Sequence, residues 1–334
     1  MIKRSVQSRY TRLAGIGFGI LFFSIWFWGP AESYLSKGTP ALKVNGPRTL
    51  PIRATHAFTI SPDGRYFASS DGRLLTIWDQ EQRRATATIA LDHAIEWLQF
   101  SASGRHLTLK TGDLFQTWDT HSWKVIDEKN VVPEQILIEA LVTTKNRLIA
   151  ARFQKDLTDV IDLSNGKVLL SVNTQLNGNY FSFDSSGQLA AYFVRQNKQI
   201  ELHDLRSGEW VDTIDADPCY GGVSMSPNGR YVAWNQRGRV AVWDRVKKEE
   251  TSFFAGQNIF TREFPGIAFS SDSSMIALAS GSGIKIYGLT DHQLLADIVT
   301  NRIDFKSLDF SNDNTAIAVT YRTDPFPDLW EIAI

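Results

Sequence analysis

The residues of this sequence best suited to acid–base or metal chemistry are six histidines, and they recur at no spacing typical of metal ligands. They are His56, His93, His106, His121, His203 and His292. The sequence contains no His-Glu-x-x-His motif, and a single cysteine, Cys219, can form neither a Cys-x-x-Cys pair nor an internal disulfide. We therefore expect no metal site and no cofactor.

Motifs for nucleophilic catalysis and for phosphate binding are also absent from the sequence. It has no Gly-x-Ser-x-Gly turn, in which a serine would act as nucleophile. It has no Gly-x-Gly-x-x-Gly segment and no lysine-bearing loop that would hold a phosphate group. The acidic residues that recur fit turns that follow strands: Asp79, Asp119, Asp162, Asp204 and Asp244. We predict no catalytic residue and no enzymatic activity.

Side chains suited to binding a partner lie in segments that we expect to be loops. The most unusual segment is 322–328, in which Phe326 stands between two prolines. An aromatic ring on a stiff backbone loses little entropy on binding and suits an interface anchor. The alternative is that this ring folds back over its own strands. The candidate partner-binding residues are Phe326, Asp324, Arg322, His56, Glu96, Tyr180, Tyr220, Arg262 and Phe264.

The elements that must position these residues follow from an internal repeat. In its clearest copies, Ser61-Pro62-Asp63-Gly64 and Ser226-Pro227-Asn228-Gly229, a hydrophobic residue precedes a tight turn. The first turn residues of the seven copies are Ser61, Ser101, Thr143, Asp184, Ser226, Ser270 and Ser311. The steps between them are 40, 42, 41, 42, 44 and 41 residues. So regular a spacing predicts seven copies of one structural unit.

A second marker with the same period identifies the unit as four strands. It is a hydrophobic residue, an aromatic residue and an acid, as in Ile77-Trp78-Asp79 and Val242-Trp243-Asp244. With its SPDG-type turns, the chain resembles the WD-repeat family over roughly residues 45–334. This resemblance implies an all-β fold, a seven-bladed propeller of four-stranded antiparallel blades. The Gly-His pair common in that family does not occur, so we expect an incomplete polar network around the tryptophans.

The two ends of the repeat region predict how the ring closes. The chain ends after the third strand of the last unit, and residues 45–52 resemble the missing fourth strand. We therefore expect residues 45–52 to complete the seventh blade, so that no sheet edge is left unpaired there. Alternation along the inner strands predicts the residues that face the central channel: Thr59, Gln99, Leu141, Ser182, Ser224, Ala268 and Asp309.

The N-terminal segment has the pattern of a membrane anchor. Four basic and no acidic side chains precede an apolar, uncharged stretch that ends with Trp26 and Trp28. We predict a cytoplasmic basic segment (1–12), a transmembrane signal-anchor helix (13–29), a linker (30–44) and the propeller (45–334). The charge asymmetry predicts that the propeller is extracytoplasmic, in the periplasm or outside the cell. Cleavage of a secretory signal peptide after Ala31 is the alternative.

Composition and charge narrow the class of function. Hydrophobic residues make up 43% and charged residues 21%, as in globular proteins. The net charge is −1, which disfavours nucleic acid as a partner. We expect a membrane-tethered, non-enzymatic scaffold that binds a protein or peptide, for instance as a subunit of an envelope complex. The alternatives are a hydrolase- or lactonase-like propeller enzyme and an envelope sensor that binds a ligand or glycan at the channel mouth.

Overall fold

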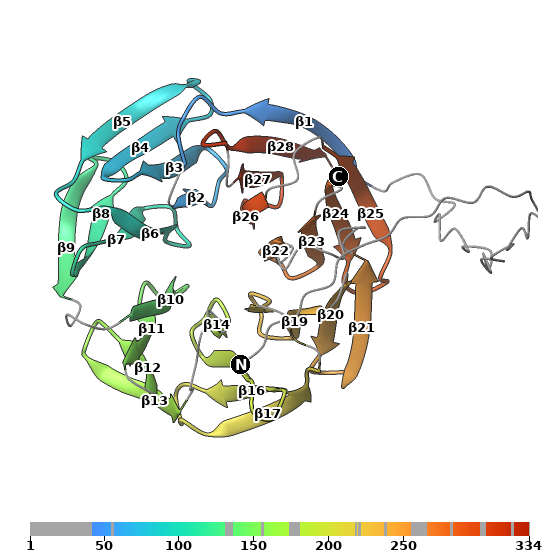
Figure 1. Cartoon of the computed structure of the whole chain (residues 1–334). Coiled ribbons are helices and arrows are strands. Elements are labelled where there is room, and N and C mark those ends of the chain that lie inside the picture. Colours follow the sequence, from blue (N-terminus) through green and yellow to red (C-terminus); the bar gives the residue numbers. More distant parts are fainter. Residues whose placement is uncertain are drawn as a thin grey trace, which may run out of the picture. The chain divides into compact units, whose positions relative to one another are not determined.

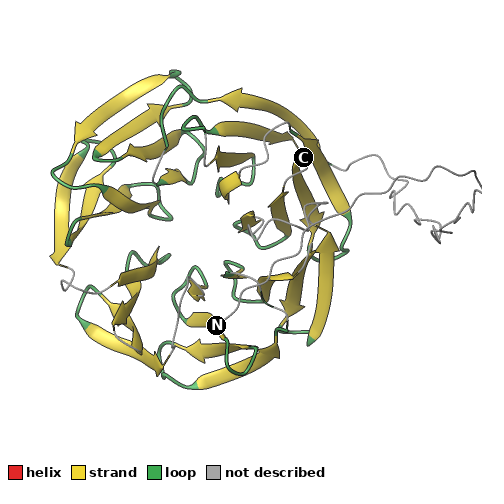
Figure 2. Ribbon diagram, viewed as in Figure 1, coloured by secondary structure: helices red, strands yellow, loops and turns green. Residues whose placement is uncertain are grey.

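The computed structural model describes most of the repeat region. The described residues are 42–54, 57–130, 136–154, 157–173, 181–217, 219, 222–236, 239–254, 266–280, 283–300, 305–321 and 324–333. Within them, all regular secondary structure is β-strand (Figure 2). Gly38–Ile334 forms one compact unit. The predicted cytoplasmic segment and signal-anchor helix lie outside the described residues.

The described strands form seven antiparallel four-stranded sheets arranged as the blades of a propeller around a central channel (Figure 1). The seven-bladed all-β fold predicted from the repeat is therefore confirmed. In each of the first six blades, four strands consecutive in sequence run from the channel to the perimeter. The outermost strands follow the perimeter of the ring (Figure 1).

The first blade comprises β2 (Phe58–Ile60), β3 (Tyr66–Asp71), β4 (Leu74–Asp79) and β5 (Arg84–Ala90). The second comprises β6 (Ile95–Phe100), β7 (His106–Thr111), β8 (Leu114–Asp119) and β9 (Lys124–Asn130). The third comprises β10 (Ile136–Val142), β11 (Leu148–Gln154), β12 (Leu157–Asp162) and β13 (Lys167–Asn173). The next two comprise β14 (Phe181–Phe183), β15 (Leu189–Val194), β16 (Gln199–Asp204) and β17 (Trp210–Asp215); and β18 (Val223–Met225), β19 (Tyr231–Gln236), β20 (Arg239–Asp244) and β21 (Glu249–Phe254). The last two comprise β22 (Gly266–Phe269), β23 (Met275–Ser280), β24 (Gly283–Gly288) and β25 (Leu294–Val299); and β26 (Phe305–Phe310), β27 (Ala316–Tyr321) and β28 (Asp328–Ala333), completed by β1 (Lys43–Thr49).

The N-terminal strand closes the ring, as the sequence predicts. β1 pairs antiparallel with β28, from Lys43 opposite Ala333 to Thr49 opposite Asp328. The strand begins at Lys43, two residues ahead of the predicted start of the propeller. Asp328 is 2% exposed and accepts hydrogen bonds from the hydroxyl groups of Thr49 (2.6 Å) and Tyr321 (2.9 Å). The buried carboxylate of Asp328, on β28, thus links β1 on one side to β27 on the other.

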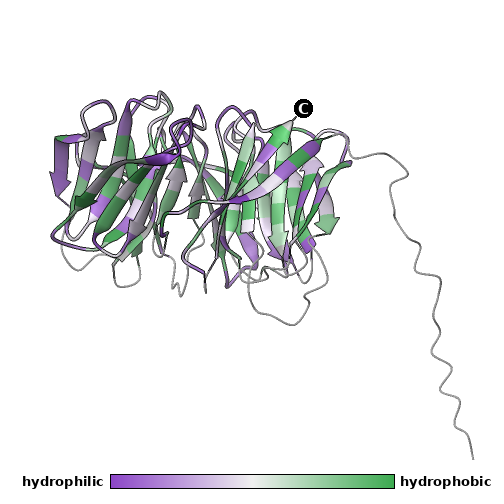
Figure 3. Cartoon of the chain, turned by 90° about the horizontal axis from the view of Figure 1, so that it is seen from above, coloured by the Kyte–Doolittle hydropathy of each residue, from purple (hydrophilic) through white to green (hydrophobic). Residues whose placement is uncertain are grey.

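The hydrophobic core of the described residues lies between blades. Each of seven clusters of buried side chains joins two neighbouring blades, one cluster at every junction of the ring. The cluster between the last and the first blade, for example, contains Leu329, Ala318, Phe67 and Ile60. Figure 3 shows apolar residues along the strands and mainly hydrophilic residues in the loops at the upper edge. Every sheet therefore buries both of its faces.

The recurring acids have the structural role predicted for them. Asp244 accepts hydrogen bonds from the backbone N–H groups of Val246 and Lys247 and forms a two-pronged ion pair with Arg230. Burial opposes the charge of Asp244, but these hydrogen bonds outweigh it and lower the pKa of the carboxyl group. Asp79 and Asp162 also pair with an arginine, in the first and third blades, but each accepts both N–H groups on its Oδ2 atom.

The tryptophans at the second position of the hydrophobic–aromatic–acid marker lack polar partners among the described residues. The indole N–H groups of Trp78, Trp118, Trp243 and Trp330 are buried without a hydrogen-bond partner among the described residues. The incomplete network expected from the missing Gly-His pair is thus observed. In the fourth blade His203 replaces the tryptophan, and its ring stacks on Tyr192 and forms a 3.1 Å hydrogen bond with the hydroxyl group of that residue.

We predict that Asp328→Ala loosens the ring at its closure. The substitution removes the acceptor of the buried Tyr321 hydroxyl group and of the exposed Thr49 hydroxyl group, which costs about 3 kcal/mol of unfolding free energy. Thr49→Val removes only one of the two bonds and should cost about 1 kcal/mol. Urea unfolding of the full-length chain measures both values. Equal losses for the two variants would contradict the role given to the carboxylate.

Candidate functional site

The loop that carries Phe326 is held rigidly at the seam where the ring closes. The carbonyl oxygens of Pro325 and Pro327 accept hydrogen bonds from the backbone N–H groups of Ala54 (2.7 Å) and Leu50 (2.8 Å). A side-chain oxygen of Asp324 accepts one from the N–H of Phe326 itself (2.9 Å). The backbone on both sides of Phe326 is therefore bound to the segment that follows β1.

The ring of Phe326 projects partly into solvent from this fixed backbone. Phe326 is 39% exposed, whereas Leu50, in the segment that holds the loop, is 1% exposed. Phe326 is therefore neither fully buried nor fully exposed. Such a preorganised aromatic group loses little conformational freedom when a partner covers it.

The structure describes two further candidate residues, and they lie in different places. Asp324 is half-buried and supports the Phe326 loop, as described above. Glu96, on β6 in the second blade, pairs with Lys110, which also donates to the carbonyl oxygen of Gly112 (3.0 Å). Glu96 is thus bound within its own blade, apart from the seam. The remaining candidates lie outside the described residues: Arg322, His56, Tyr180, Tyr220, Arg262 and Phe264.

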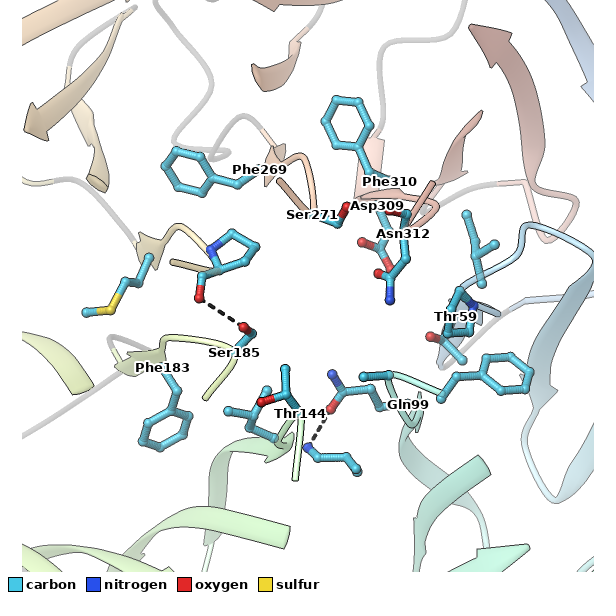
Figure 4. Close-up of a pocket in the computed structure, with 18 residues that line it drawn as sticks. Thr59, Gln99, Thr144, Phe183, Ser185, Phe269, Ser271, Asp309, Phe310 and Asn312 are labelled. Atoms are coloured by element: carbon cyan, nitrogen blue, oxygen red, sulfur yellow. Dashed lines mark hydrogen bonds between the residues drawn. The ribbon is translucent and has the colours of Figure 1, made fainter. Parts of the chain in front are cut away.

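The described residues enclose two adjoining cavities in the central channel, of about 310 and 270 Å³. Thr59, Gln99, Leu141, Phe183 and Asp309 line both of them. The larger cavity extends to the turns of the first marker (Figure 4). Five of the seven residues predicted to face the channel line a cavity: Thr59, Gln99, Leu141, Ser182 and Asp309. Ala268 instead packs in the core between the sixth and seventh blades.

Two carboxyl groups give the smaller cavity its charge. Asp309 reaches solvent in the channel, but the blades surround that solvent, and the resulting desolvation raises the pKa of Asp309 to about 7. Desolvation likewise raises the pKa of Glu139 to about 7. In each case one backbone N–H, that of Phe310 or Ala140, opposes the rise.

Glu139 is a charged channel residue that the alternation pattern did not predict. It lies on β10 two residues before Leu141, so alternation places the two on the same side of the strand. The repeat marker covers only the last residues of each inner strand, and β10 extends back to Ile136. Following the alternation two residues further toward the N-terminus would have identified Glu139.

The turns of the first marker link neighbouring blades on the channel side. The N–H of Thr144 donates to the carbonyl oxygen of Ser185 (2.9 Å), and the N–H of Ser185 donates to that of Pro227 (3.0 Å). Further along, the N–H of Asn228 donates to the hydroxyl group of Ser273 (3.1 Å). The SPDG-type turns thus join neighbouring blades by hydrogen bonds around part of one end of the channel.

In the part of the chain that the structure describes, no group of three or more histidine, cysteine or acidic side chains is placed to hold a metal ion. Nor do the described residues include a helix long and apolar enough to cross a membrane. Comparison of the sequence with models of protein families, and with curated proteins, finds no match.

We predict that the channel carboxyl groups make stability fall as the pH rises. Their pKa values are higher in the folded chain than the ordinary 3.8 and 4.5. The folded state therefore binds more protons between about pH 4 and about pH 7, and its stability decreases through that range. Asp309→Asn should raise the urea midpoint at about pH 8 and leave it nearly unchanged at about pH 4. A gain of the same size at both pH values would refute this assignment.

Proposed function

We propose that this chain is a membrane-tethered, non-enzymatic propeller scaffold that binds a protein or peptide partner on the extracytoplasmic side of the membrane. The blades supply a rigid closed frame, and propellers of this kind commonly present loops to partners. The two repeat markers support a divergent place in the WD-repeat family. The basic residues ahead of the apolar stretch 13–29 support the tether and its orientation.

The observation that carries the proposal is the fixed, partly exposed ring of Phe326. Backbone hydrogen bonds from Leu50 and Ala54 hold the loop from both sides, and Asp324 holds the N–H of Phe326 itself. Interface hot spots are enriched in preorganised aromatic side chains with a polar rim. Phe326 is the anchor in this interface, and Asp324 keeps it in the binding conformation.

We predict that Phe326→Ala abolishes capture of the partner without unfolding the propeller. Truncating a central aromatic anchor costs about 2 kcal/mol of binding free energy, or roughly thirtyfold in affinity. Proximity labelling or crosslinking of the full-length protein in its native membrane, followed by mass spectrometry, identifies proteins that the wild type captures and the variant loses.

Phe254→Ala is the matched control. Phe254 is 48% exposed at the end of β21 in the fifth blade, away from the seam in sequence and blade. Loss of the partner in Phe326→Ala but not in Phe254→Ala supports the proposed face. Equal capture by wild type and both variants, with the propeller folded, rejects Phe326 as the anchor.

A further inference from the structure

The inner-strand residues at the channel fall into two groups according to the use of their polar atoms. Gln99 and Ser182 each accept a hydrogen bond from the inner strand of the next blade. The N–H of Val142 donates to Oε1 of Gln99 (2.8 Å), and the N–H of Met225 donates to Oγ of Ser182 (3.0 Å). These two side chains hold blades together.

Thr59 occupies the equivalent position in the first blade but makes no such bond. Thr59 is only 6% exposed, and its hydroxyl group has no hydrogen-bond partner among the described residues. The hydroxyl oxygen of Thr59 remains accessible to solvent, and it points into the cavity in Figure 4. A hydroxyl group that is otherwise buried and aims at an open cavity is available to a ligand.

Asp309 occupies the same position in the seventh blade, next to Thr59 around the ring. Figure 4 shows the two side chains on one side of the cavity, together with Asn312. The carboxyl group receives a hydrogen bond from the N–H of Phe310, its own neighbour in sequence, and none of the kind that Gln99 and Ser182 receive. Two adjacent oxygen acceptors therefore face the channel.

The charged side chains that line the cavities around this pair are acidic, and the one base on β26, Lys306, does not line either cavity. The strands that pack against β26 are β2, β22, β23 and β27, and their one titratable side chain is Tyr321, whose hydroxyl group donates to Asp328. On β26 itself the other charged residue is Lys306. Among the described residues that line the two cavities, the charged ones are Asp309 and Glu139, both acids.

We propose that the channel is a binding site for an organic cation, an ammonium or guanidinium group, which Asp309 and Thr59 hold and Glu139 attracts. Each bound N–H donates to the carboxylate of Asp309 or the hydroxyl oxygen of Thr59, neither of which serves to join blades. The group can belong to a free amine or to a basic side chain of a protein. The site does not rest on the partner proposed for Phe326.

The test is calorimetric titration of the full-length protein in neutral detergent with n-butylammonium, n-butylguanidinium and, as neutral control, butanol. One or both cations should bind, and butanol should not. Because the carboxyl group of Asp309 changes from mostly protonated to mostly ionised, binding should be about tenfold tighter at about pH 8 than at about pH 6. A blocked tripeptide with a central arginine separates the two sources: binding supports a protein side chain, and failure beside n-butylguanidinium supports a free amine.

Two variants make the site specific. Asp309→Asn should weaken cation binding at least tenfold at about pH 8 and remove most of its pH dependence. Asp297→Asn, which changes an acid on β25 at the perimeter, should leave both unchanged. Absence of cation binding, equal binding of butanol, or binding unaffected by Asp309→Asn would overturn the proposal. Phe326→Ala should bind the cations like the wild type, so this test and the partner test fail independently.

Discussion

Burial of apolar side chains between neighbouring blades is the interaction on which the rest of this structure depends. No blade has a core of its own, because the seven clusters of the described residues each belong to two sheets. A blade is therefore stable only between two others, and the last must meet the first. The pairing of β1 with β28 satisfies that requirement, since it supplies the strand that the final blade otherwise lacks. The smallest of the seven clusters, around Phe115 and Ala150, lies between the second and third blades, where Gln99 adds a hydrogen bond to Val142.

The channel edge of the blades differs from these apolar junctions because polar side chains also lie there. Seven inner strands converge there, and Leu141 and Phe183 line both cavities beside polar residues. Some polar atoms at this edge join blades, as those of Gln99 and Ser182 do. Others, on Thr59 and Asp309, make no bond to a neighbouring blade among the described residues and face the cavities. Rigidity and binding capacity at the channel therefore come from the same ring of positions, divided between blade contacts and open acceptors.

Much of the fold was predictable from the sequence because short local motifs mark each copy of the repeat. The turn from Ser61 to Gly64 and its copies mark each blade, and the surplus segment before Phe58 indicates how the ring closes. Alternation also predicted five residues that line the channel cavities, including Asp309. It missed Glu139 because the marker covers only the end of β10. The fixation of Phe326 by Leu50 and Ala54 was not predictable, because these hydrogen bonds join backbone groups more than 250 residues apart.

The antiparallel pairing of β1 with β28 also determines how the ring responds to mechanical force. A force on the chain ahead of Lys43 acts on the end of β1 that lies beside Ala333. From that end the strand separates like a zipper, one pair after another, so the load never falls on all the pairs together. In the other six blades the outermost strand follows its pairing partner directly in sequence, so the two strands are also joined through the backbone. Tension on this segment therefore separates the β1–β28 pairs first, then the hydrogen bond from Thr49 to Asp328, and last the bonds from Leu50 and Ala54 to the Phe326 loop.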